Sequence, residues 1–84
     1  MLNMHGLKAA DILLSKVEAE VAKNPGREVV EVRVKVGRYL FADARELTSA
    51  WELIVRDTPL SKARLVLETT DGRDVTLAGL TWVN

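Results

Sequence analysis

Residues 30–36 constrain the fold more than any other segment, because valine alternates there with charged residues. The segment reads Val30-Glu31-Val32-Arg33-Val34-Lys35-Val36. Successive side chains of a β-strand point to opposite faces, so the valines would pack on a core while the charged side chains face water or a partner. β-Branched valine also suits a pleated surface. The alternation predicts a strand with one buried face, which ends at Gly37.

Two other segments have the period of an amphipathic helix. The first predicts a helix from about Gly6 to the Asn24-Pro25-Gly26 turn, and the second predicts one over 44–57, before Thr58-Pro59. Asp43 and Glu46 form the pattern of an N-cap with a reciprocal acid at the third helical position. The apolar positions of the two helices are Leu7, Ala10, Leu14, Val17 and Val21, and then Leu47, Ala50, Trp51, Ile54 and Val55.

Two strands are predicted after the second helix, over 63–68 and 73–83, with Asp71-Gly72 as a hairpin turn between them. A two-residue loop would place Leu80 and Trp82 on the face of Leu65, with Val75 and Leu77 on the opposite face. Either both faces of the last strand are partly covered, or a β-bulge near Gly79 shifts the alternation.

These elements predict an α/β two-layer sandwich in the order α-β-α-β-β, with both helices on one face of a three-stranded mixed sheet. The 84 residues form a single domain over 1–84. The other face of the sheet would carry Glu31, Arg33, Lys35 and Arg64, either as a solvated surface with cross-strand ion pairs or as a docking surface.

The composition argues against several classes of function. With one histidine and no cysteine, the chain has no thiolate zinc site, and we expect no enzymatic activity and no catalytic residues. Twelve basic and twelve acidic residues cancel, so no overall field favours nucleic acid or an anionic membrane. We expect a cytoplasmic protein without a signal peptide or a membrane span, since Lys8, Asp11 and Lys16 interrupt the N-terminal apolar stretch.

His5 is the one candidate metal ligand of the usual nitrogen type. An ordinary metal site needs three or four side-chain ligands, which this composition does not supply around one histidine. An imidazole with backbone nitrogens and a free terminal amine can form a planar nitrogen site, the geometry that Ni(II) or Cu(II) favours. Such a site requires a histidine very near the N-terminus of the mature chain.

Four features of the sequence together carry a family resemblance: Met4-His5 at the head of a helix and the segments VVEVRVKVG, ELTSAWELIVRDTPLSKARLVLE and GRDVTLAGLTWVN. In these features the chain resembles the HypA/HybF family of nickel chaperones for hydrogenase maturation. It implies a nickel-handling accessory protein for hydrogenase or a related nickel enzyme, with Ni(II) at Met4, His5 and Gly6. A maturation GTPase and a hydrogenase precursor are the partners that it implies. The family's cysteine-rich zinc module would be replaced by a tight turn over 68–73, so no zinc is expected.

Two departures from the family pattern favour a second hypothesis. Met1-Leu2-Asn3 precede the Met4-His5 motif, and Gly6 stands where the family usually has glutamate. Translation from Met4 would restore the Met-His terminus. The alternative function is a metal-independent interaction or structural module of the same fold, with a stable partner or a homodimer bound through the sheet face or Trp82.

Overall fold

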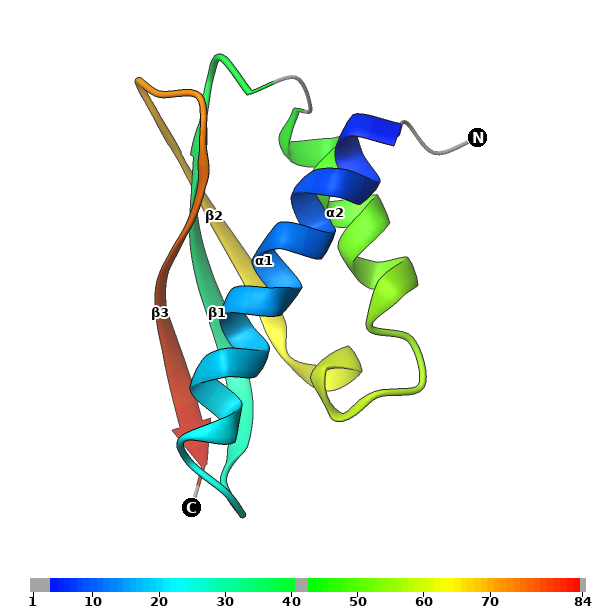
Figure 1. Cartoon of the computed structure of the whole chain (residues 1–84), viewed down its shortest axis with the longest axis vertical. Coiled ribbons are helices and arrows are strands. Elements are labelled where there is room, and N and C mark those ends of the chain that lie inside the picture. The colour runs from blue at the N-terminus through cyan, green and yellow to red at the C-terminus, as the bar shows by residue number, and fades with distance from the viewer. Residues whose placement is uncertain (1–3, 41–42, 84) are drawn as a thin grey trace.

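The computed structural model describes residues 4–40 and 43–83, and Met4 through its backbone only. The elements are α1 (Met4–Ala22), β1 (Glu28–Gly37), α2 (Ala44–Ile54), the short 3-10 helix η1 (Pro59–Lys62), β2 (Arg64–Thr70) and β3 (Val75–Val83). Both helices lie on one side of a three-stranded mixed sheet (Figure 1). The predicted α/β two-layer fold and its element order are confirmed. None of the helices in the described part of the chain combines the length and apolarity that crossing a bilayer requires.

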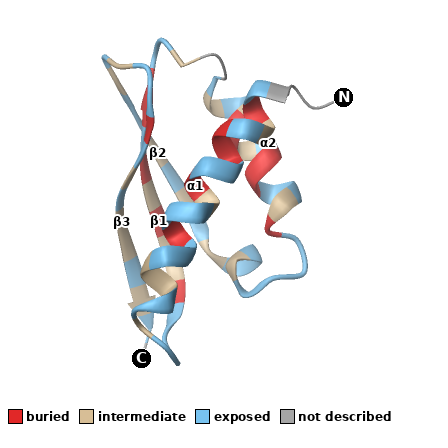
Figure 2. Cartoon of the chain, viewed as in Figure 1, coloured by how far each residue is buried: buried red, intermediate tan, exposed pale blue. Residues whose placement is uncertain are grey.

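The core lies between the sheet and the two helices, and the buried residues gather on α1, α2 and β1 (Figure 2). Trp51 is its largest fully buried side chain, as expected from the apolar face of the second helix. Two small residues of α1, Ala9 and Ala10, are also fully buried, which lets the helix approach its neighbours closely. The remaining buried residues are Leu13, Val17, Val29, Val32, Val34, Val36, Leu47, Ala50, Val55 and Val75.

The two helices differ from the predicted ranges at one end each. Helix α1 begins at Met4 rather than near Gly6, so it includes the whole Met4-His5-Gly6 motif. Helix α2 ends at Ile54 instead of Asp57. Asp57 has a φ of 64°, in the left-handed region that ends a right-handed helix.

The predicted hairpin between the last two strands is wrong. The strand order is β2-β1-β3: β1 pairs in parallel with β2 and antiparallel with β3, and the last two strands are not neighbours. Residues 71–74 instead carry the chain across the end of β1. Backbone N–H groups of Gly37 and Tyr39 donate to the carbonyls of Asp74 and Gly72 in this crossing at 2.9 and 2.8 Å, and the Arg38 N–H donates to the carbonyl of Thr70, the last residue of β2, at 2.8 Å.

A β-bulge in β3 explains why the apolar residues of the last strand change their alternation along the sequence. Val34 lies opposite Leu77 and Arg33 lies opposite Gly79, so Ala78 is the extra residue of β3. The shift brings the side chains on both sides of the bulge onto one face, with Val75 and Leu77 joining Leu80 and Trp82 at the core. The bulge near Gly79 was one of the two predicted alternatives, and it is the one that forms. A second irregularity, between Val29 and Glu31, moves Val30 out of the buried row.

Candidate functional site

The Met4-His5-Gly6 motif forms the first turn of α1 instead of preceding the helix. The His5 side chain is exposed, whereas Gly6 is buried. The Met4 side chain lies outside the described residues. The first four N–H groups of an α-helix have no acceptor within the helix, so the backbone nitrogens of this motif take no part in the helical hydrogen-bond ladder. An exposed imidazole therefore stands beside backbone nitrogens that the helix does not use.

Gly6 packs directly on the first turn of α2. A Cβ added at Gly6 would lie 3.0 Å from the backbone oxygen of Glu46 and 3.3 Å from its Cβ, closer than most real Cβ contacts. Glycine therefore allows the two helices to meet at their first turns. Both helices begin at the same end of the molecule (Figure 1), so this contact brings the first turn of α2 to the Met4-His5-Gly6 motif.

The two carboxylates at the start of α2 have different roles. Asp43 is the N-cap: its Oδ1 accepts a hydrogen bond from the Glu46 N–H at 2.8 Å, which confirms the predicted cap. Oε2 of Glu46 is buried and accepts no hydrogen bond, so this oxygen does not form the expected reciprocal bond with the Asp43 N–H. Asp43 is thus engaged in its own helix, whereas Glu46 retains a buried carboxylate oxygen without a hydrogen-bond partner.

No group of three histidine, cysteine, aspartate or glutamate side chains that could hold a metal ion occurs within residues 4–40 and 43–83. The His5 imidazole is the side chain of the motif that could bind a metal, and Glu46, whose backbone oxygen and Cβ lie beside Gly6, is the acidic residue that the structure places in contact with the motif. Met4 and Gly6 contribute backbone nitrogens and carbonyl oxygens to the same turn.

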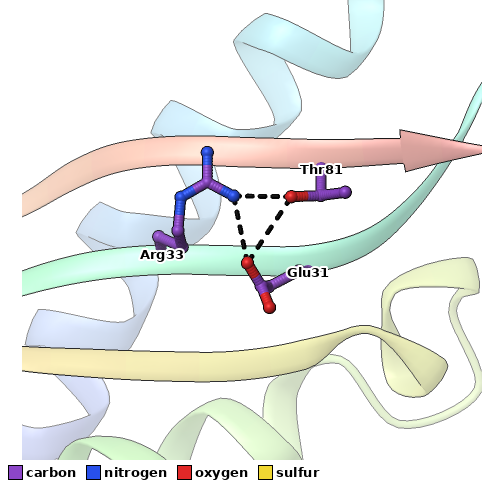
Figure 3. Close-up of polar contacts among 3 residues, drawn as sticks. All are labelled: Glu31, Arg33 and Thr81. Atoms are coloured by element: carbon purple, nitrogen blue, oxygen red, sulfur yellow. Dashed lines mark hydrogen bonds and ion pairs between the residues drawn. The ribbon is translucent and has the colours of Figure 1, made fainter.

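The outer face of the sheet carries the predicted charged residues, with both helices behind it (Figure 3). The guanidinium of Arg33 donates to Oε1 of Glu31 at 3.0 Å and to the hydroxyl of Thr81 on β3. Its Nη2 lies over Gly79, 2.5 Å from the position that a Cβ would take. In sheet register, Lys35 and Glu68 are opposite each other, as are Glu31 and Arg64. Opposite charges thus face each other across β1 and β2, but the ion pair that forms among the described residues of this face, Arg33 with Glu31, lies within β1 and is not one of the predicted cross-strand pairs.

The remaining residues singled out in the sequence lie away from the motif. Trp82 is half-buried at the other end of the sheet, with the guanidinium of Arg27 5.1 Å from its ring centre. Arg38 pairs with Asp71 at 2.8 Å in the crossing segment. A groove of about 510 Å³ lies between the last turn of α1 and η1, at the opposite end of α1 from His5. None of these features joins the candidate metal site.

Sequence reasoning did not predict the contact of Glu46 with the Met4-His5-Gly6 motif. The spacing of Glu46 from Asp43 was interpreted only as a helix start, which it is. Glu46 and Gly6 are forty residues apart in the sequence, and no pattern in either helix specifies which turns meet. A glycine in the first turn of an amphipathic helix was the available signal, since it indicates close approach of another backbone.

Comparisons with known proteins agree with the resemblance found in the sequence. Residues 4–75 match the family described as "HypA: Hydrogenase/urease nickel incorporation, metallochaperone, hypA", and the match begins at Met4. A hydrogenase maturation factor HypA from Solidesulfovibrio magneticus is 36% identical over 67 residues, which cover 80% of this chain and 57% of that protein. The chain thus spans little more than half the length of this relative.

The fold is also found in a solved structure. The solution structure of the Ni metallochaperone HypA from Helicobacter pylori superposes with a TM-score of 0.68, over 90% of this chain and 72% of that one. The sequence identity is 20%, so this likeness concerns the fold alone. Since the family match covers most of the chain and includes both helices, β1 and β2, the chain belongs to the HypA family.

Proposed function

We propose that this chain is a nickel-handling accessory protein, a metallochaperone for the maturation of hydrogenase or a related nickel enzyme. The observation that carries the proposal is the family match that begins at Met4, directly before the only histidine of the chain. Nickel is cargo in this proposal, so no catalytic turnover is expected. The proposed unit is the nickel-binding-type domain of the family without a zinc module, since residues 71–74 alone join β2 to β3.

The proposed nickel ligands are the His5 imidazole and backbone nitrogens of Met4, His5 and Gly6. These nitrogens lie in the first helical turn, so a metal that binds them breaks no hydrogen bond of the α1 ladder. Imidazole and backbone nitrogen together suit the planar geometry that Ni(II) adopts. The exposure of His5 leaves the site open for transfer of the ion to a partner.

The proposed partners are a maturation GTPase and a hydrogenase precursor. The outer face of the sheet supports a docking role because neither α1 nor α2 covers it within the described residues, and opposite charges face each other across its strands (Figure 3). A second candidate function, a metal-independent interaction module, is favoured by the same uncovered face, on which Val66 and Val83 are exposed. A complex that persists in EDTA would support the second function, whereas one that requires Ni(II) would support the first.

Calorimetric titration with Ni(II) tests the proposed function. His5→Ala should weaken nickel binding at least about tenfold, since changes that only reorient a ligand already cost 10–100-fold. The matched control is Lys8→Ala, which changes an exposed residue of the same helix outside the motif and should bind as the unsubstituted chain does. Equal affinity of the His5→Ala variant and the unsubstituted chain would remove His5 from the mechanism.

A further inference from the structure

Strand β2 has a free edge. It is the outermost strand on one side of the sheet, and it pairs with β1 in an uninterrupted register from Arg64 to Thr70 (Figure 3). Edge strands are usually protected by a β-bulge, a proline or an inward-pointing charged side chain. The described residues of β2 have none of these, and its side chains on the core side include Leu65 and Leu67. The backbone N–H and C=O groups along this edge can therefore pair with a further strand.

The opposite edge of the sheet, formed by β3, is protected. The β-bulge at Ala78 interrupts the regular spacing of its backbone groups. The ammonium group of Lys16 donates to the Val75 carbonyl at 3.0 Å and crosses this edge near the start of β3. Strand addition is thus favoured at β2 and disfavoured at β3.

The apolar side chains of β2 are less buried than those of the strand beside it. Val66 is 37% exposed on the outer face, and Leu65 and Leu67 are half-buried on the inner face. Val32 and Val34, which lie opposite the two leucines on β1, are 0% and 1% exposed. A strand added beside β2 would remove this remaining apolar surface from water, which favours association.

The charges of β2 are complementary to those of a second copy of the same strand. Arg64 and Glu68 flank Val66 on the outer face, and neither side chain forms a hydrogen bond or an ion pair within residues 4–40 and 43–83. In an antiparallel pair with Val66 opposite Val66, each Arg64 faces the Glu68 of the other copy. The same register sets Leu65 opposite Leu67 on the inner face. Registers centred on Leu65 or Leu67 would place Arg64 opposite an uncharged residue, so the charges select the register about Val66.

We infer that two copies of this chain associate by antiparallel pairing of their β2 edges, in register about Val66. A two-fold axis perpendicular to the sheet relates the copies, so that both copies use the same surface. The two three-stranded sheets then form one continuous sheet, with the helices of both copies on the same side. The association requires neither nickel nor His5, so the inference goes beyond the proposed function.

The test is sedimentation velocity of the whole chain in EDTA, over a concentration series that reaches about 1 mM. The unsubstituted chain should shift from monomer to dimer as concentration rises. Glu68→Arg places like charges opposite each other at two positions of the pair, and Arg64→Glu does the same with the opposite sign. Each variant should raise the dissociation constant of the dimer at least about tenfold.

An equimolar mixture of the two variants tests the register itself. In a mixed dimer each position again has opposite charges, so the mixture should associate about as strongly as the unsubstituted chain. The matched control is Glu18→Arg, which makes the same charge change as Glu68→Arg at an exposed position of α1 and should not alter association. Circular dichroism verifies that each variant is folded, as expected for substitutions at exposed positions.

Three results would overturn the inference. The chain could remain monomeric throughout the series, the dimer could be equally stable in both single variants, or the mixture could fail to recover association. The nickel titration of His5→Ala is independent of all three results, so a failure of this inference is distinguishable from a failure of the proposed function.

Discussion

Gly37 is the position at which the strand order can be tested by a single methyl group. A Cβ added there would lie 2.6 Å from the backbone nitrogen of Arg73 and closer still to the carbonyl group of Gly72. These are backbone atoms of the segment that crosses the end of β1, and they cannot rotate away as a flexible side chain would. Gly37→Ala should therefore push residues 71–74 off the strand.

The expected cost follows from the hydrogen bonds that the displacement breaks. The N–H groups of Gly37 and Tyr39 donate to the carbonyls of Asp74 and Gly72, which belong to the displaced segment. At about 1 kcal/mol each, the loss of these two bonds lowers the free energy of unfolding by about 2 kcal/mol. For a domain of this size, that corresponds to a melting temperature lower by about 8–16 °C.

Thermal and urea denaturation followed by circular dichroism measure the effect. The matched control is Gly72→Ala in the same segment, where an added Cβ would meet no atom closer than the Thr70 hydroxyl at 3.7 Å. This control should be neutral or slightly stabilising, since alanine reduces the freedom of the unfolded chain. If both variants lose the same stability, or if Gly37→Ala loses less than about 0.5 kcal/mol, the crossing segment does not lie over β1 as described.

Three further predictions concern the helix ends and the metal site. Asp43→Ala should lower the free energy of unfolding by about 1 kcal/mol in urea denaturation, because it removes the acceptor of the Glu46 N–H; an unchanged value would mean that water replaces the cap. Asp57→Gly should raise the free energy of unfolding by about 0.5–1 kcal/mol, because glycine adopts a φ of 64° without strain, and a lower melting temperature would contradict this. A chain that begins at Met4 should bind Ni(II) more tightly in calorimetry than one that begins at Met1, because its terminal amine adjoins His5. Equal affinities would exclude the amine as a ligand.

The periodic patterns predicted the elements because periodicity is a local property. The valine alternation of 30–36 identified the strand that became the centre of the sheet, and the spacing of Asp43 and Glu46 identified the start of α2. Helix ends were less well predicted. Helix α2 ended at Ile54, and the left-handed conformation of Asp57, three residues later, is one that aspartate tolerates but that no sequence pattern predicted.

The hairpin prediction failed because Asp71-Gly72 specifies a turn but does not specify which strands pair with each other. The same turn can return a strand beside its predecessor or carry the chain over a third strand. Pairing with β1 places the valine-rich strand between two neighbours, so both of its edges are hydrogen-bonded. It also puts β3 under α1, where Lys16 donates to the Val75 carbonyl at 3.0 Å. These gains depend on contacts across the whole chain.

The sequence by itself determined the element types, the two-layer class and the Met4-His5 motif that marks the family. All three follow from local spacing and from the kinds of residue present. Only the tertiary structure decided the strand order, the bulge at Ala78 and the contact of Gly6 with Glu46. Each of these pairs segments that are distant in the sequence, and its outcome depends on which backbones can approach closely once the core is packed. The composition contains a single histidine, and the fold packs the backbone and Cβ of Glu46, from the second helix, against the residue that follows this histidine.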